Sequence, residues 1–251
     1  MPATAGGRFR TRYAGTEEDV RACQRLRYLT FRAGRGQAAE PDGLDADAFD
    51  PLCRHVMVED AQTGDLVCCF RLMPLESGAE IEKSYSAQWY ELSNLHEFPG
   101  RMVELGRFCI HPDYRDPAIL RLAWSEMSRF VDAHGIELLF GCSSFQGVDG
   151  EAYTDAFALL KERHLAPARW LPRVKAPRVF PFGTLLKLEK PDLKKALTRM
   201  PPLLRTYLVM GGWVSDHAVI DDDLKTLHVF TGVEVGRVPE ARARVLRRAG
   251  V

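Results

Sequence analysis

The stretch from Met102 to Ile110 restricts the fold more than any other, because it sets charged side chains inside an apolar run. It reads Met-Val-Glu-Leu-Gly-Arg-Phe-Cys-Ile, a pattern typical of a buried β-strand. A buried carboxylate or guanidinium costs free energy unless it is paired or used in function. Strict alternation would send Glu104 and Arg107 to opposite faces, whereas Gly106 would permit a bulge that re-aims one of them. The pattern therefore predicts either a structural ion pair or a reaction centre.

Strand and helix patterns alternate along the first two thirds of the chain. We expect strands at 8–13, 55–60, 66–73, 102–110 and 136–142, and helices at 16–31, 117–133 and 151–164. This order favours an α/β sandwich, in which helices flank a mixed sheet. Beyond 170 repeated prolines weaken the pattern, and we expect strands at 179–182 and 184–189 that close the sheet, with helices at 192–199 and 239–248. No change in composition marks a boundary, so we expect one domain over residues 1–251 with a basic C-terminal extension from about residue 170.

The charges cancel overall but are separated along the chain. Residues 40–70 carry eight acidic side chains against one arginine, whereas residues 161–205 carry twelve lysines and arginines. This separation indicates either two surfaces with different partners or two solvated faces without a role. No recognition helix or basic–aromatic repeat accompanies the basic segment, so we expect no nucleic-acid binding.

Neither a metal site nor a membrane span is indicated. The six cysteines form no Cys-x-x-Cys pair and have no zinc spacing, so we expect reduced thiols and no metal. The N-terminus has no apolar signal-peptide core, and no window approaches the roughly 20 apolar residues that a spanning helix needs. We therefore expect a cytoplasmic protein.

Other charged residues stand where secondary structure does not require them. Arg27 and Phe31 are four residues apart and so share one face of the first helix. Asp47 and Asp50 lie in a loop, where paired acids bind a metal or a cationic substrate, or cap a helix. Arg71 ends an apolar strand, a position that suits binding of a carboxylate or phosphate and equally suits a plain surface residue.

The order of these motifs resembles the acyl-homoserine-lactone synthases, which share an Arg-x-x-x-Phe helix, an Asp-x-x-Asp loop, a strand ending in Arg-Leu and a Glu-x-x-Arg strand. The amino-acid sequence of the motifs is more similar to that of a sister family, the ornithine lipid N-acyltransferases. The segments that carry this resemblance are Asp50-Pro-Leu-Cys-Arg-His55, Glu104–Arg115, Leu139-Phe-Gly-Cys-Ser-Ser-Phe145 and residues 201–221, and it extends over about residues 8 to 235.

The resemblance implies a GNAT-like fold with a mixed, mostly antiparallel sheet. It also implies transfer of a long, often 3-hydroxylated, fatty acyl group to the α-amine of ornithine, which gives lyso-ornithine lipid. The glycine-rich loop that holds pyrophosphate in acetyl-CoA-using GNAT enzymes is absent, and Tyr114-Arg-Asp-Pro-Ala-Ile-Leu stands in its place. Fewer backbone N–H groups are free there, which favours acyl carrier protein, with its phosphopantetheine thioester, as the co-substrate over free CoA. No bound cofactor is expected.

The resemblance further implies roles for the residues of the acceptor side. Glu104 would be the general base, acting directly or through a water, and Arg107 would orient Glu104 or hold the carboxylate of the amino acid. Asp47 and Asp50 are candidates for binding the cationic side chain of the acceptor.

On the donor side, Arg71 would organise the acyl or pantetheine part of the thioester. Ser143 and Ser144 would line a gap in which pantetheine lies, and Arg27 and Phe31 complete the expected substrate-binding set.

The basic block at 161–205 is the expected docking surface for acyl carrier protein, which is acidic. The block and the residues after it interleave cations with apolar side chains, a mixture that also suits peripheral contact with the anionic inner face of the membrane. These apolar residues are Leu203, Leu204, Tyr207, Leu208 and Trp213.

Three other interpretations remain open at this stage. One keeps the reaction but changes the acceptor to glutamine, glycine or another amino acid. Another is an autoinducer synthase that uses S-adenosylmethionine and releases an acyl-homoserine lactone. The third is a non-catalytic module that binds acyl carrier protein or lipid.

Overall fold

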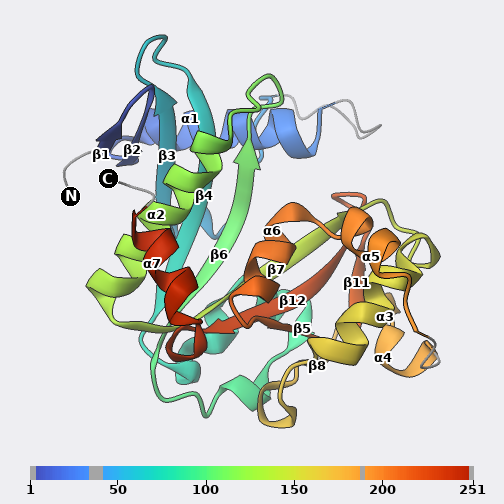
Figure 1. Ribbon diagram of the computed structural model, residues 1–251. Coiled ribbons are helices and arrows are strands. Elements are labelled where there is room, and N and C mark those ends of the chain that lie inside the picture. Colours follow the sequence, from blue (N-terminus) through green and yellow to red (C-terminus); the bar gives the residue numbers. More distant parts are fainter. Residues whose placement is uncertain (1–3, 34–41, 187–189, 249–251) are drawn as a thin grey trace. The chain divides into compact units, whose positions relative to one another are not determined.

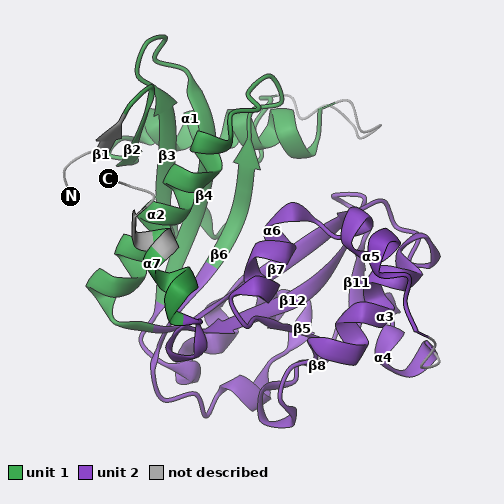
Figure 2. Ribbon diagram, in the orientation of Figure 1, with its two compact units in different colours: residues 1–74, 105–136, 240–251 green, residues 75–104, 137–239 purple. Residues whose placement is uncertain are grey.

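The computed structural model describes residues 4–33, 42–186 and 190–248 (Figure 1). The chain divides into two compact units (Figure 2). Unit 1 contains residues 1–74, 105–136 and 240–251, and unit 2 contains residues 75–104 and 137–239. Strand β6 (Arg101–Ile110) begins in unit 2 and ends in unit 1, and it confirms the strand predicted from Met102 to Ile110.

Unit 1 is built around an antiparallel set of strands. Its strands follow one another in the order β1 (Thr4–Gly6), β2 (Phe9–Tyr13), β3 (Arg54–Asp60), β4 (Leu66–Leu75) and the second half of β6. The pairs β1–β2, β2–β3 and β3–β4 are antiparallel. Its helices are α1 (Glu17–Phe31), α2 (Pro117–His134) and α7 (Glu240–Arg248), and α7 packs on α2.

The helix ends of unit 1 follow from their capping residues. Thr16 and Asp19 form a reciprocal capping box at the start of α1. The Asp116 side chain accepts a hydrogen bond from the Ala118 backbone N–H at the start of α2. That helix ends at Gly135, whose left-handed φ of 60° suits glycine. Both helices confirm the sequence prediction.

The two long helices of unit 1 cover opposite faces of its strands. Met57 on β3 packs against Cys23 and Leu26 of α1. Its neighbour Val58 points to the other face, where its cross-strand partner Thr11 donates a hydrogen bond to Glu126 of α2. Both faces of β3 are therefore buried, which explains why its sequence is apolar without clean alternation.

Unit 2 contains the other strands of the ten-stranded sheet to which β6 belongs. The order is the first half of β6, β7 (Ile136–Gln146), β12 (Thr226–Glu234), β11 (Ala218–Asp221) and β9 (Val179–Phe180), and β10 (Trp213–Val214) also pairs with β12. Strands β5 (Tyr90–Glu91) and β8 (Arg173–Val174) form a separate ribbon. The helices are α3 (Thr154–Arg163), α4 (Phe182–Leu185), α5 (Leu193–Arg199) and α6 (Pro202–Val209).

One face of this sheet carries the core of unit 2. Phe145 on β7 lies opposite Leu227 on β12, so both side chains project from the same face. They pack in one cluster with Phe157 of α3, Ala196 of α5 and Leu204 of α6. The helices expected at 151–164 and 192–199 are thereby confirmed, α3 being preceded by a short 3₁₀ turn at Glu151–Tyr153.

The C-terminal third differs from the prediction in two ways. The strand expected at 184–189 is wrong at its start, because Thr184 and Leu185 belong to helix α4, while residues 187–189 lie outside the described part. The sheet is extended instead by β11 and β12. Leu204, Tyr207 and Trp213, expected on a docking surface, are buried in the core. Within the described residues, no helix is both long enough and apolar enough to cross a bilayer.

Candidate active site

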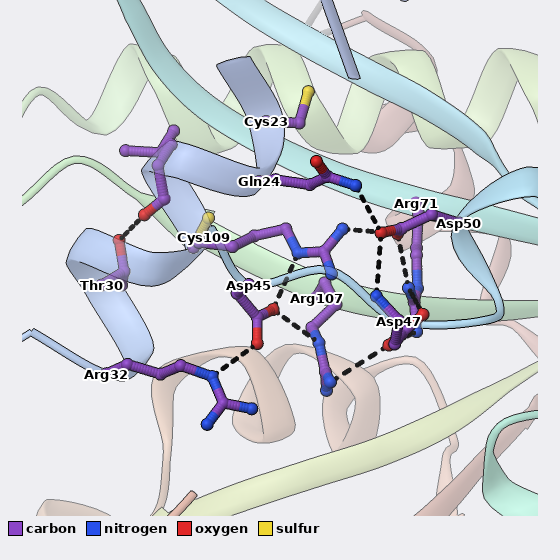
Figure 3. Close-up of polar contacts among 12 residues, drawn as sticks. Cys23, Gln24, Thr30, Arg32, Asp45, Asp47, Asp50, Arg71, Arg107 and Cys109 are labelled. Carbon is purple, nitrogen blue, oxygen red and sulfur yellow. Dashed lines mark hydrogen bonds and ion pairs between the residues drawn. The ribbon is translucent and has the colours of Figure 1, made fainter. Parts of the chain in front are cut away.

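A network of arginines and aspartates lies within unit 1 (Figure 3). Its carboxylates come from the loop between α1 and β3, which carries Asp45, Asp47 and Asp50. Its guanidinium groups come from regular elements: Arg27 from α1, Arg71 from β4 and Arg107 from β6, with Arg32 at the C-terminal end of α1. Helices and strands thus supply the guanidinium groups, and the loop supplies the carboxylates that pair with these groups.

Arg27 is the most deeply buried member, with 1% of its surface exposed. Its Nε donates to Asp45 Oδ2 at 2.9 Å, and its Nη1 donates to Asp50 Oδ1 at 2.6 Å. Asp50 also accepts a hydrogen bond from Gln24 Nε2 at 2.9 Å. Buried charges of both signs are therefore paired and hydrogen-bonded, which is what their removal from water requires.

Arg71 and Arg107 complete the network from the strands. Arg71 holds Asp47 through two parallel hydrogen bonds of 2.6 and 2.8 Å and reaches Asp50 at 2.8 Å. Arg107 donates to Asp45 at 3.0 Å and to Asp47 at 3.2 Å. Such two-point contacts fix orientation as well as charge. Asp47, Asp50, Arg71 and Arg107, which the sequence predicted for the acceptor and donor sides, all lie in this network, and their roles stay predictions.

The network keeps Asp45 and Asp50 ionised. Burial raises the pKa of Asp45, but Arg107 and Arg27 outweigh burial and hold that pKa below its usual value. The same balance applies to Asp50, whose pKa is lowered because Arg27 and its other hydrogen-bond partners outweigh burial. Burial lowers the pKa of Arg71, but Asp47 more than compensates and the net shift is upward.

The strand geometry explains how the arginines fit. Arg107 has a φ of 52°, a left-handed conformation that non-glycine residues rarely adopt. The irregular backbone that the sequence predicted at Gly106 therefore falls at Arg107. Gly106 instead leaves room for the Arg71 side chain, since a Cβ atom at this position would lie 3.3 Å from Arg71 Nε.

One hydrogen-bond donor of the network is unused. Nη2 of Arg27 is buried and has no hydrogen-bond partner among the described residues. Asp45 and Asp50 accept hydrogen bonds from the Nε and Nη1 atoms of the same guanidinium instead. An unused donor on a buried guanidinium is costly, and a carboxylate ligand would satisfy it.

Phe31 contributes apolar contact rather than charge. It is half-buried and packs against the cluster formed by Cys23, Leu26, Met57, Cys69 and Cys109, beside the network.

A contact within the segment from Asp50 to His55 fixes its turn, because His55 Nε2 lies 3.0 Å from the Asp50 carbonyl oxygen. That contact steadies the 3₁₀ turn Asp50–Leu52, which presents Asp50 to the arginines.

Glu104 belongs to unit 2 and is held by different partners. Its carboxylate accepts hydrogen bonds from the backbone N–H groups of Tyr85 and Ser86 at 2.8 and 2.7 Å, and from Ser86 Oγ at 2.5 Å. Ser86 Oγ also lies 3.5 Å from the Cys142 sulfur. Donors directed at both carboxylate oxygens fix the orientation of this carboxylate.

The two predicted serines of β7 point in opposite directions. Ser143 is buried, and its Oγ accepts a hydrogen bond of 2.9 Å from Thr231 on the neighbouring strand β12. Ser144 is exposed on the other face. Only one of the two can therefore line any given surface, as strand alternation requires.

Three participants were not predicted from the sequence. Asp45 accepts from three arginines, Arg32 pairs with Asp45 at 2.9 Å, and Ser86 binds Glu104. The Asp-Ala-Asp spacing of Asp45 and Asp47 was the available signal for the first. No sequence signal indicated Ser86, because its loop is far from Glu104 in the sequence. In the described part of the chain, no group of histidine, cysteine and acidic residues could hold a metal ion.

Comparison with known proteins assigns the chain to a family. An acetyltransferase (GNAT) domain matches residues 26–125. The L-ornithine N(alpha)-acyltransferase of Rhodobacter capsulatus is 36% identical over 88% of both chains. The chain belongs to the ornithine N-acyltransferase family. The enzyme of the same name from Brucella abortus is 31% identical over 92% of this chain and 86% of its own length.

Solved structures agree with this family at the level of the fold. The N-acyl amino acid synthase FeeM, from uncultured soil microbes, is 10% identical, covers 91% of this chain and 92% of its own, and has a TM-score of 0.51. The CoA-dependent acyl-homoserine lactone synthase BjaI is 16% identical, covers 93% and 83%, and has a TM-score of 0.50. The predicted GNAT-like fold is thereby confirmed, and the named relatives together with the GNAT match confirm the predicted acyltransferase class.

The ornithine N-acyltransferase framework separates the predicted residues into two groups. The GNAT match at 26–125 includes Glu104 and all six predicted residues of unit 1, which are Arg27, Phe31, Asp47, Asp50, Arg71 and Arg107. Ser143 and Ser144 lie beyond it.

Proposed function

We propose that this enzyme transfers a fatty acyl group, often 3-hydroxylated, from acyl carrier protein to the α-amine of ornithine, giving lyso-ornithine lipid. The observation that carries the proposal is the buried, unused Nη2 donor of Arg27 in the unit 1 network. An amino acid offers a carboxylate for such a donor. Relatives named for ornithine support this choice of acceptor.

The acceptor would bind by its carboxylate. Asp47 and Asp50 were predicted to hold the cationic side chain of ornithine, and this role stays a prediction. Their hydrogen bonds to Arg71 and Arg27 favour a different role, that of fixing the guanidinium groups. In this proposal Arg107, whose side chain is 11% exposed, helps Arg27 to bind the carboxylate.

Glu104 would take the proton. An amine must be neutral to attack, so we assign the fixed carboxylate of Glu104 as general base, directly or through a water. The amine nitrogen then forms a bond to the thioester carbonyl carbon. Backbone N–H groups near the irregular residue Arg107 are the proposed donors to the oxyanion. Collapse of this tetrahedral intermediate breaks the carbon–sulfur bond, and the leaving thiolate of phosphopantetheine takes up a proton.

The donor and the cellular setting are part of the same proposal. We propose that acyl carrier protein docks on basic residues of the 161–205 block, and that Arg71, Ser143 and Ser144 serve the acyl and pantetheine side. We further propose that residues 1–251 act as one acyltransferase domain, with the basic part from about residue 170, in the cytoplasm and with peripheral contact to the inner face of the membrane.

Expression in a bacterial host without aminolipids tests the reaction. The expected result is a new ninhydrin-positive monoacyl lipid, whose mass identifies the amino acid and the acyl chain. Glu104→Gln should abolish it, whereas Glu97→Gln, at a side chain that is 90% exposed, should not. The proposal fails if soluble protein yields no such lipid when 3-hydroxyacyl carrier protein is present. A diffusible lactone would instead identify an autoinducer synthase.

A further inference from the structure

Two leucines of helix α5 form an exposed apolar pair. Eight large hydrophobic side chains are exposed in the described residues, and only Leu193 and Leu197 among them share a helix. They are 45% and 48% exposed. Since they are four residues apart, they lie together on one side of α5. Single exposed leucines are ordinary, but a pair on one helix face indicates a contact surface.

The opposite side of α5 fixes this orientation. Ala196 and Met200 are buried in the core of unit 2, where they pack with Phe157 of α3. Asp192 caps the helix, because its side chain accepts hydrogen bonds from the Lys194 and Lys195 backbone N–H groups at 3.0 and 3.1 Å. The buried residues and the N-terminal cap fix the orientation of the helix, so its leucines cannot turn toward the core.

Cations flank the leucine pair in the sequence. The exposed basic residues within three positions of either leucine are Lys190, Lys194, Lys195 and Arg199. Lys195 lies 3.6 Å from Asp192, whereas Lys190 and Lys194 have no ion pair with any described residue. A helix that sets aliphatic side chains beside lysines matches the boundary of an anionic bilayer, with phosphates for the cations and acyl chains for the leucines.

We infer that α5 docks this enzyme on an anionic phospholipid surface, with Leu193 and Leu197 in the acyl boundary and Lys190 and Lys194 against lipid phosphates. This inference rests on the proposed function only in that a lipid product must pass into a bilayer. An acidic carrier protein would also attract the lysines, but two aliphatic side chains between them favour lipid. The carrier protein would then use other parts of the basic block.

Sedimentation of the full chain with vesicles tests the inference. The wild type should bind vesicles of equal phosphatidylcholine and phosphatidylglycerol, and bind pure phosphatidylcholine weakly. Leu193→Ser/Leu197→Ser should lower the partition coefficient by about tenfold without changing charge. Lys190→Gln/Lys194→Gln should lower it and weaken its salt dependence. Val148→Ser, at an aliphatic side chain that is 38% exposed on a turn of unit 2, is the matched control and should bind as the wild type does.

The outcomes separate this inference from the proposed function. Acyl transfer from a soluble acyl carrier protein, measured without vesicles, should be unchanged in the leucine variant. Failure of the wild type to bind the mixed vesicles, or full binding by the leucine variant, overturns the docking inference alone. Loss of carrier-protein affinity in the leucine variant, with vesicle binding intact, assigns α5 to the carrier protein and also overturns it. Absence of transfer by the wild type overturns only the proposed function.

Discussion

Asp45→Asn is the sharpest test of the unit 1 network. The Asp45 carboxylate is 2% exposed and accepts hydrogen bonds from Arg27, Arg32 and Arg107 at 2.9, 2.9 and 3.0 Å. Asparagine keeps the shape and one oxygen, but its amide group would point donors at a guanidinium. The substitution also removes the negative charge that three guanidinium groups share.

The expected loss of stability is large. Breaking a buried ion pair by removing one partner costs about 3–5 kcal/mol. We expect about 3 kcal/mol, because the partly exposed Arg32 and Arg107 side chains can turn toward water while Arg27 cannot. Urea denaturation followed by circular dichroism measures the free energy of unfolding. Asp113→Asn, at a side chain that is 86% exposed, is the matched control and should change it by less than about 0.5 kcal/mol.

The Asp45→Asn substitution should also change how the free energy of unfolding depends on pH. The native pKa of Asp45 lies below its value in the unfolded chain, where an aspartate titrates near about 3.9. Its stabilising contribution is therefore complete above that pH and is lost as the pH falls through the native pKa. The fall in stability below about pH 4 should be shallower in Asp45→Asn than in wild type. A loss under about 1 kcal/mol at neutral pH, or an unchanged acid profile, would refute the ionised network.

Substitutions at three further positions test the strand and the general base. Gly106→Ala should cost about 1–2 kcal/mol and reduce the rate of acyl transfer, because the new Cβ would crowd Arg71 Nε at 3.3 Å; unchanged stability and rate contradict this. Arg107→Gly and Arg107→Ala both remove the guanidinium, but the alanine variant should be less stable by about 1 kcal/mol in urea, since φ is 52°. Ser86→Ala should lower kcat about tenfold with little change in KM, because Glu104 loses one donor; an unchanged kcat would separate that contact from catalysis.

Local sequence determined the elements whose signals are short-range. The capping pair at Thr16, the entry of α2 at Pro117 and its exit at Gly135 each act within one helix turn, so their positions could be predicted. The strand at Met102–Ile110 was predicted because few other structures are compatible with an apolar run of that length. The motif order from Arg27 to Arg107 also indicated the family, which comparison confirmed.

Tertiary structure decided what pairs with what. Strand β12 is buried along nearly its whole length, so its sequence lacks the alternation that marks a strand, and its partner β7 lies far away in the chain. Asp45 could not be ranked above Asp47 or Asp50, because a loop has no periodicity that aims a side chain. Its central place follows only when α1, β4 and β6 bring their arginines together around one buried point, where each unpaired charge would be costly.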